Sequence, residues 1–222
     1  PEPVEVSLTL TEAGIDLLLH ADRPAARMEH VRLAGLADAL DLARVSWVAA
    51  GAMEPEPIVT RRLPVIRFGQ VPVEVPPGSF LQATAFGEAE LAQAIAAWTR
   101  GAAHAVDLFA GLGTLTFAMA PQVRRVRAVE GDAASAAALL RAARAAKLFG
   151  VQVEARDLAR RPLMPAELEG CDLVVLDPPR VGASEQVQAL AAARVAKVIY
   201  AACSPESFAR DARVLVDAGL EL

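Results

Sequence analysis

Cysteine is scarce in this 222-residue sequence, and the scarcity excludes several classes of protein. Only Cys171 and Cys203 occur, in unrelated surroundings, so the chain has no disulfide framework of the kind that stabilises small secreted domains. Two cysteines alone also cannot build an iron–sulfur or zinc site. We therefore expect a cytoplasmic protein without a metal site.

Long hydrophobic runs are also missing, and lysine is rare. No apolar stretch reaches the ~18–20 residues that span a bilayer, and no signal peptide is visible, so we expect no membrane contact. Of the 22 basic residues 20 are arginine, which we attribute mainly to GC-rich coding because alanine is abundant too. The net charge of −5 argues mildly against a protein that coats nucleic acid through charge alone.

What is present is a chain rich enough in hydrophobic residues, at 54%, to bury a core. Its first part predicts a small α+β domain over residues 1–78. Two strand-like runs flank a turn over 11–14 and indicate a hairpin, and a helix-spaced pattern follows. The expected elements are strands over 4–10, 15–20, 45–50, 64–69 and 71–76, a helix within 25–42, and a proline-rich loop over 54–57.

Strands and helices alternate after residue 78. The expected strands are 104–109, 125–130, 151–155, 172–177 and 195–202, and the expected helices are 87–99, 113–120, 132–147, 184–192 and 205–218. Several strands are continuous apolar runs, which indicates a parallel sheet with helices on both faces, an α/β, Rossmann-like domain over 79–222. In such sheets ligands bind at the carboxyl ends of the strands.

The first three strand ends predict a nucleoside pocket. Gly111 and Gly113 form a tight turn before a helix, where a ligand can approach the backbone. Glu130 ends the next strand, in a place suited to accepting hydrogen bonds from ribose hydroxyls. Asp157 could accept from an adenine amino group, although a capping or turn role is nearly as plausible. A missing third glycine and the absence of a clear phosphate loop favour S-adenosylmethionine over NAD.

The last two strand ends carry the candidate chemistry. Two prolines keep the backbone extended after Asp177 and present it at the edge of the sheet. Arg180 follows, instead of the aromatic residue that would favour methylation of an exocyclic amine. Cys203 precedes Ser204, a good helix cap, and a helix amino terminus raises the thiolate fraction of a nearby cysteine. Cys171 opens a strand and is expected to be a core residue.

Five segments occur in an order and spacing that resemble RNA uracil-5-methyltransferases: FLQAT (80–84), DLFAGLGTLT (107–116), VEGD (129–132), LDPPRVGA (176–183) and CSPESFARD (203–211). Members of this family use S-adenosylmethionine to make 5-methyluridine in ribosomal and transfer RNA. The sequence is most similar to the branch that acts on 23S ribosomal RNA. The resemblance covers 79–222, and the preceding segment resembles, more weakly, the small central domain of that branch.

This resemblance implies a role for each matching residue. Cys203 matches the nucleophile that adds to C6 of uracil, so that C5 can accept the methyl group. Gln82 matches a glutamine that contacts cofactor and target base, Asp177 also serves the uracil edge, and Arg180 is a further substrate-binding candidate. The implied cofactor-binding residues are Gln82, Phe109, Gly111, Gly113, Thr114, Glu130, Asp157 and Asp177.

The sequence also departs from the family pattern at several points. Thr114 and Ser204 stand where relatives often have asparagine, yet both keep hydrogen-bonding ability. The family's general base, a glutamate, is expected beyond residue 222, and an RNA-binding barrel before residue 1. The chain begins without methionine and ends in what resembles a new strand, so we expect a piece of a longer, monomeric protein that binds RNA.

Three alternatives remain at this point. A cytosine-5 methyltransferase uses the same cysteine chemistry. A non-catalytic RNA-binding or cofactor-binding fragment is also compatible with a truncated chain. An NAD-dependent oxidoreductase is disfavoured by the missing third glycine. The sequence does not identify the target nucleotide.

Overall fold

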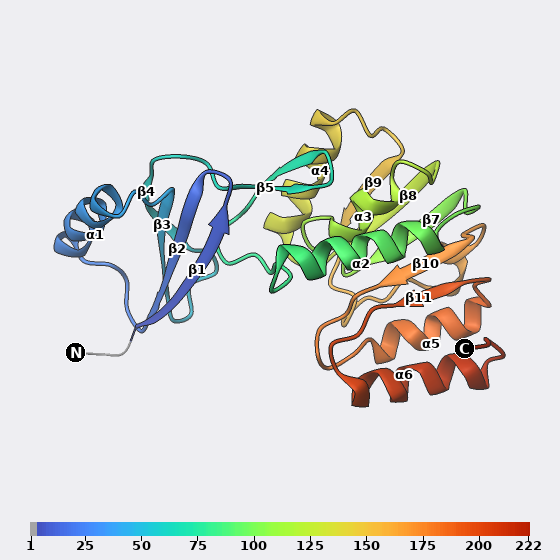
Figure 1. The fold of residues 1–222 in the computed structure, drawn as a ribbon. Helices are drawn as coiled ribbons and strands as arrows, with labels where there is room; N and C mark the ends of the chain where they lie inside the picture. The colour runs from blue at the N-terminus through green and yellow to red at the C-terminus, as the bar shows by residue number, and fades with distance from the viewer. Residues whose placement is uncertain (1–3) are drawn as a thin grey trace. The chain divides into compact units, whose positions relative to one another are not determined.

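The computed structural model describes residues 4–222, and the chain divides after Phe80 into two units (Figure 1). Residues 1–3 of the expected first domain lie outside the described residues. The sequence places the domain boundary after residue 78, and the structure places the division after residue 80. Each unit has its own sheets and core, and we describe each by itself.

The first unit is built around a mixed sheet with the strand order β1-β2-β3-β4. Its elements are β1 (Glu5–Thr11), β2 (Gly14–Ala21), α1 (Arg27–Ala39), β3 (Arg44–Ala49) and β4 (Glu56–Thr60). The expected hairpin is β1 with β2, whereas β3 runs parallel to β2 because α1 provides the crossover. The core of this sheet consists of Leu17, Leu19, Ala37, Leu42, Val45 and Trp47.

Strand β4 corrects the loop that the sequence predicts over 54–57. Glu56 and Pro57 belong to this strand, and Pro57 lies opposite Ser46 of β3. A proline is tolerated there because β4 has a single strand neighbour in its sheet and the register shifts between Val45 and Ser46. Proline density therefore marked the start of an edge strand rather than a connection.

A hairpin and a buried ion pair complete the first unit. Strands β5 (Val65–Phe68) and β6 (Val71–Glu74) form the hairpin. Arg44 donates to both carboxylate oxygens of Asp16, at 2.8 and 2.6 Å, and its Nη2 also donates to the carbonyl of Val75 at 2.8 Å. Both charges are buried, and these bonds fix the segment after the hairpin to the four-stranded sheet.

The second unit is a fully parallel sheet with the strand order β11-β10-β7-β8-β9, which confirms the expected α/β, Rossmann-like arrangement. Its strands are β7 (His104–Leu108), β8 (Arg125–Glu130), β9 (Val151–Ala155), β10 (Leu173–Leu176) and β11 (Val198–Tyr200). Its helices are α2 (Ala85–Trp98), α3 (Thr114–Met119), α4 (Ala133–Ala145), η1 (Pro165–Leu168), α5 (Ser184–Ala193) and α6 (Pro205–Asp217).

The strand order places helices on both faces of this sheet. The chain moves in one direction from β7 to β8 to β9, and in the opposite direction from β10 to β11. Since such crossovers are right-handed, α3 and α4 lie on one face and α5 lies on the other. Helix α6 packs beside α5 (Figure 1). Buried aliphatic residues such as Leu176, Leu190 and Leu215 form the core on the α5 side.

The last strand is shorter than the expected 195–202. Strand β11 has three residues, and the chain before it turns at Arg194, which has a left-handed φ of 52°. Ala201 still donates its N–H to the carbonyl of Leu176, but the ladder ends there. The segment that carries Cys203 therefore lies outside the sheet, between β11 and α6.

Candidate active site

The turn after β7 has an unusual backbone. Phe109, Gly111 and Gly113 all have left-handed φ values, of 61°, 54° and 101°. Glycine adopts this conformation freely, whereas a bulky residue such as Phe109 pays about 1–3 kcal/mol of strain. The third glycine that the sequence lacks would fall after these two, near Leu115 or Phe117; the additional left-handed residue, Phe109, comes before them.

The two glycines have different surroundings. A side chain at Gly113 would meet the ring of Phe117 at 2.7 Å, so this position is closed by packing against α3. A Cβ on Gly111 would meet no atom within 4 Å, so the turn is open on that side. A ligand can therefore approach the backbone at Gly111. Thr114, the first residue of α3, is half-buried beside this turn.

Glu130 fixes the turn to the end of β8. One carboxylate oxygen accepts from the N–H of Gly111 at 2.7 Å, and the other accepts from the N–H of Asp132 at 2.7 Å. Each oxygen can accept a further hydrogen bond. The ribose contact expected of Glu130 remains a prediction, and the structure adds that this residue also holds the glycine turn in place.

Sequence reasoning missed Asp107, which lies inside β7. Its side chain is 0% exposed, Thr116 donates to its Oδ2, and its Oδ1 has no partner among the described residues. Burial is the largest cause that raises the pKa of Asp107 to about 7; the hydrogen bond from Thr116 opposes this shift, and the negative charges of Asp177 and Glu130 add to it. The available signal was a carboxylate flanked by apolar residues within a strand, Val106 before it and Leu108 after it.

Two expected site residues that lie far apart in the sequence meet directly. The amide of Gln82 donates to Oδ2 of Asp177 at 3.1 Å. Burial raises the pKa of Asp177, and the hydrogen bond from Gln82 opposes this shift. The half-buried Asp177 directly follows β10, and its N–H donates to the carbonyl of Leu108 in β7 at 3.3 Å.

The other expected residues lie at the surface. Oδ1 of the exposed Asp157 accepts from the N–H groups of Ala159 and Arg160 at 3.0 and 3.3 Å. Asp157 therefore stabilises a turn, which is one of the two roles that the sequence allowed. Arg180 and Cys203 are exposed, and their side chains make no hydrogen bond to any residue in the described range. Ser204 caps α6 as expected, accepting from the N–H of Ser207 at 3.4 Å.

Strand register puts the expected site residues at one edge. Leu108, Leu176 and Tyr200 are register partners across β7, β10 and β11, and Val129 of β8 pairs with Leu108. Phe109, Glu130 and Asp177 each come one residue after this row, and Cys203 comes three residues after it. All four therefore lie at or just after the carboxyl ends of neighbouring parallel strands.

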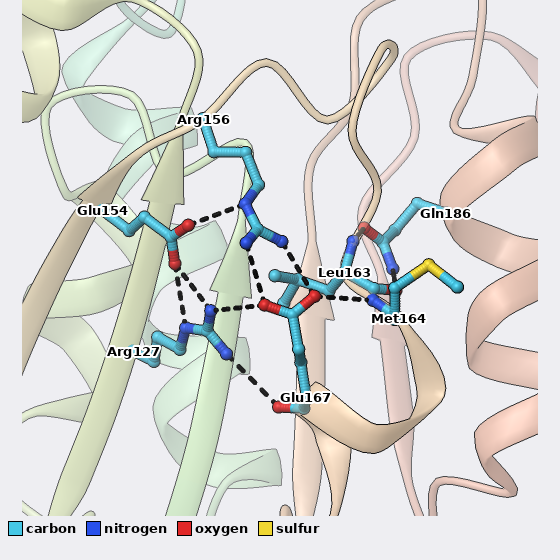
Figure 2. Close-up of polar contacts among 7 residues, drawn as sticks. All are labelled: Arg127, Glu154, Arg156, Leu163, Met164, Glu167 and Gln186. Atoms are coloured by element: carbon cyan, nitrogen blue, oxygen red, sulfur yellow. Dashed lines mark hydrogen bonds and ion pairs between the residues drawn. The ribbon is translucent and has the colours of Figure 1, made fainter.

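A charged network holds the segment that follows Asp157 (Figure 2). Glu167 accepts from Arg156 at 3.0 and 2.8 Å and from the N–H of Met164 at 2.9 Å. Arg127 of β8 bridges Glu154 at 2.6 Å and Glu167 at 3.3 Å. Hydrogen bonds from Arg156 and Met164 lower the pKa of Glu167 to about 2.

Gln186 of α5 anchors the same segment from the other side (Figure 2). Its buried side chain accepts from the N–H of Leu163 at 2.8 Å and donates to the carbonyl of Leu163 at 3.3 Å. Residues 156–168 therefore form an ordered connection although they contain little regular structure.

Replacing Glu167 by glutamine tests whether this network orders the connection. Because the charge-assisted bonds to Arg156 and Arg127 are lost, we expect the free energy of unfolding to fall by about 1–2 kcal/mol. Hydrogen exchange of residues 157–164 should become faster. Glu169→Gln is the matched control, since Glu169 is exposed and has no side-chain partner among the described residues. Equal exchange in both variants would contradict this role.

Neither a metal centre nor a membrane span is found in the described part of the chain. No group of three or more His, Cys, Asp or Glu side chains in residues 4–222 is arranged to hold a metal ion. None of the helices there is long and apolar enough to cross a membrane.

Comparison with known proteins shows close similarity to bacterial proteins named uncharacterized RNA methyltransferases. The Caulobacter vibrioides protein is 41% identical over 220 residues, 97% of this chain and 51% of that protein. The Brucella suis protein is 42% identical over 221 residues, 99% of this chain and 52% of that protein. The chain thus spans about half the length of the curated relatives it matches. No protein-family model matches it.

A relative with a specific name matches a shorter part. The 23S rRNA (uracil(1939)-C(5))-methyltransferase RlmD of Chromohalobacter salexigens is 40% identical over 148 residues, 66% of this chain and 30% of that protein. Among solved structures, the tRNA (uracil-54, C5)-methyltransferase of Pyrococcus abyssi, in complex with S-adenosyl-L-homocysteine, matches with a TM-score of 0.72. The sequences are 17% identical, and the match covers 95% of this chain and 52% of that one.

The chain has a class I methyltransferase fold. The parallel sheet of the second unit, with helices on both faces, is the part that carries this fold. In this unit, the glycine turn, Glu130 and the Gln82–Asp177 pair all lie at the carboxyl edge, where ligands of such sheets bind.

Proposed function

We propose that the protein transfers a methyl group from S-adenosylmethionine to C5 of a uridine in 23S ribosomal RNA. The observation that carries the proposal is the place of Cys203, three residues after the end of β11, the strand next to the one that presents Asp177. The names of the relatives support RNA methylation, and the relative named RlmD supports uracil C5 as the target.

The residues at the carboxyl edge fit S-adenosylmethionine in charge and shape. Three carboxylates, Asp107, Glu130 and Asp177, lie close enough that the charges of the latter two raise the pKa of Asp107. A negative site suits a cation, and the backbone at Gly111 is open to a ligand. When bound, the cofactor supplies a methyl group on a positively charged sulfonium. Glu130 would hold the ribose, Asp157 the adenine, and Phe109 and Thr114 would line the site.

The proposed chemistry begins at Cys203. Its thiolate forms a bond to C6 of uracil, and the electron pair of the C5–C6 double bond moves toward the C4 carbonyl, which makes C5 nucleophilic. After C5 has been methylated, a base removes the C5 proton and the thiolate leaves. Gln82 carries a donor and an acceptor, which suits the edge of uracil, and Arg180 suits a neighbouring phosphate.

Access to C6 sets a requirement on the RNA. A thiol that lies after the end of a strand cannot reach C6 of a base stacked within a helix, so the target must be single-stranded or turned out of its helix. The exposure of Cys203 is compatible with such a base. Because the net charge of this chain is −5, attraction to phosphate has to come from local cationic side chains such as Arg180 rather than from the overall charge.

Nucleoside analysis tests the proposal. Full-length protein is incubated with methyl-labelled cofactor and 23S ribosomal RNA from cells that lack its gene, and the RNA is digested. We expect labelled 5-methyluridine. Labelled 5-methylcytidine would show a cytosine enzyme, and cofactor binding without transfer to any RNA would show a non-catalytic binding protein. Either result would overturn the proposed activity.

A further inference from the structure

Asp211 of α6 is a buried carboxylate with donors on three sides. Its side chain is 1% exposed. Oδ2 accepts from the hydroxyl of Tyr200 at 2.7 Å and from the N–H of Ala183 at 2.7 Å. Oδ1 accepts from Nε and Nη2 of Arg210, at 2.9 and 2.7 Å. Both oxygens are thus fully engaged, and none of the roles assigned above uses this residue.

These bonds join α6 to the loop that begins at Asp177. The N–H of Ala183 belongs to the residue that caps α5 and ends this loop. Arg210 adds a bond from Nη2 to the carbonyl of Val181 at 2.9 Å. Gly182 lies between them with a φ of 82°, and a side chain there would collide with the guanidinium of Arg210 and the carboxylate of Asp211. The backbone of the loop at Gly182 therefore lies directly against side chains of α6, with no room for a side chain between them.

The same carboxylate closes the segment that carries Cys203. Tyr200 is the last residue of β11, and Asp211 lies in the second turn of α6. Their hydrogen bond ties together the two ends of residues 200–211, and the ring of Tyr200 also packs edge-on against Phe208 at 5.4 Å. The thiol of Cys203 makes no hydrogen bond to another described residue, so its placement depends on the backbone of this closed segment.

The charge state of Asp211 also supports a role in holding these segments together. Burial would raise the pKa of Asp211, but hydrogen bonds from Ala183, Tyr200 and Arg210 together hold it below its usual range. The pKa of Tyr200 is raised by burial and by its bond to Asp211, so the phenol stays a donor at neutral pH. The cluster is therefore a fixed anion with neutral and cationic donors around it.

We propose that Asp211 is a positioning residue that holds Cys203 and the Asp177 loop in the relative placement that covalent addition requires. The expected effect on the rate of adduct formation rests on the proposed uracil chemistry. The expected effect on the order of the two segments rests on the geometry alone. Asp211 would contact neither RNA nor cofactor. Its loss should therefore slow formation of the bond between sulfur and C6 more than it weakens cofactor binding.

The test compares Asp211→Asn with Asp217→Asn in the full-length protein. Asp217 lies on the same helix, is exposed, and among residues 4–222 its side chain pairs with Arg213 alone, so it is a matched control. Two quantities are measured for each variant: the single-turnover rate of adduct formation with RNA that contains 5-fluorouridine, and the dissociation constant of S-adenosylmethionine. We expect Asp211→Asn to slow adduct formation roughly 10- to 100-fold. Its cofactor affinity should stay within about threefold of wild type, and Asp217→Asn should match wild type.

Hydrogen exchange separates this inference from the proposed function. In Asp211→Asn, we expect faster exchange in residues 182–183 and 201–207, with little change in β7 and β8. If wild-type protein forms no adduct, the uracil chemistry is wrong, and the exchange of these two segments still decides the positioning role. Unchanged exchange there, or an equal loss of cofactor affinity and adduct rate, would overturn the inference. Tyr200→Phe, which removes one donor, should lie between wild type and Asp211→Asn.

Discussion

Replacing Cys203 by alanine in the full-length protein is expected to abolish its covalent adduct with RNA that contains 5-fluorouridine. The adduct requires a sulfur–C6 bond, and fluorine at C5 cannot leave as a proton, so elimination is blocked and the bond persists. Alanine offers no nucleophile in its place. The measurement is the fraction of protein that co-migrates with labelled RNA under denaturing conditions, in the presence of S-adenosylmethionine.

Cys171→Ala provides the matched control for this result. Cys171 is half-buried, its thiol donates to the carbonyl of Leu173 at 2.9 Å, and burial raises its pKa, all of which disfavour a reactive thiolate. We expect this variant to form the adduct at close to the wild-type level. If Cys203→Ala retained the adduct while Cys171→Ala lost it, the nucleophile would be misassigned, and an adduct in both variants would point to another residue.

Most elements of the second unit could be predicted because their signals are local. The strands expected over 125–130 and 151–155, in which valine and alanine alternate with polar residues, coincide with β8 and β9, and Ser204 with the following proline marked the start of α6. The errors came from tertiary context. Strand β4 accommodates a proline because it lies at an edge, and β11 is shorter than expected because its ladder with β10 extends only from Val198 to Tyr200.

The sequence predicted which residues lie at the strand ends of the candidate site, but not the contacts that they make there. The rule that ligands bind at carboxyl ends selects Glu130 and Asp177 without knowledge of contacts. It does not reveal that Gln82 and Asp177 share a hydrogen bond, since 95 residues separate them. Nor does it reveal that Phe109 has a left-handed φ. A sequence pattern locates the glycines, but it does not show where another residue adopts a left-handed conformation.

Asp107→Asn is expected to change the pH dependence of stability, and this is the larger of the effects we expect on folding. The pKa of Asp107 is about 7 in the folded protein, against an ordinary value of 3.8, so folding binds a proton at this site. The stability that this proton provides is complete below about pH 4 and is lost as the pH rises to about 7. Asparagine is neutral throughout and still offers Thr116 an acceptor. Its advantage over wild type should therefore grow by about 4 kcal/mol across this window and then level off.

Hydrogen exchange of the β7 amides between pH 4 and 9 measures this difference for the second unit alone. Asp172→Asn is an informative control, because hydrogen bonds from the N–H groups of His104 and Ala103 lower the pKa of Asp172. The stability that ionised Asp172 provides is complete above its ordinary pKa of 3.8, so the difference between wild type and Asp172→Asn should stay nearly constant from pH 4 to 9, unlike that between wild type and Asp107→Asn. Parallel stability curves for wild type and Asp107→Asn would mean that Asp107 is ionised in the folded protein at all these pH values. In that case its unpartnered Oδ1 would need a donor supplied from outside the described residues, such as an ordered water.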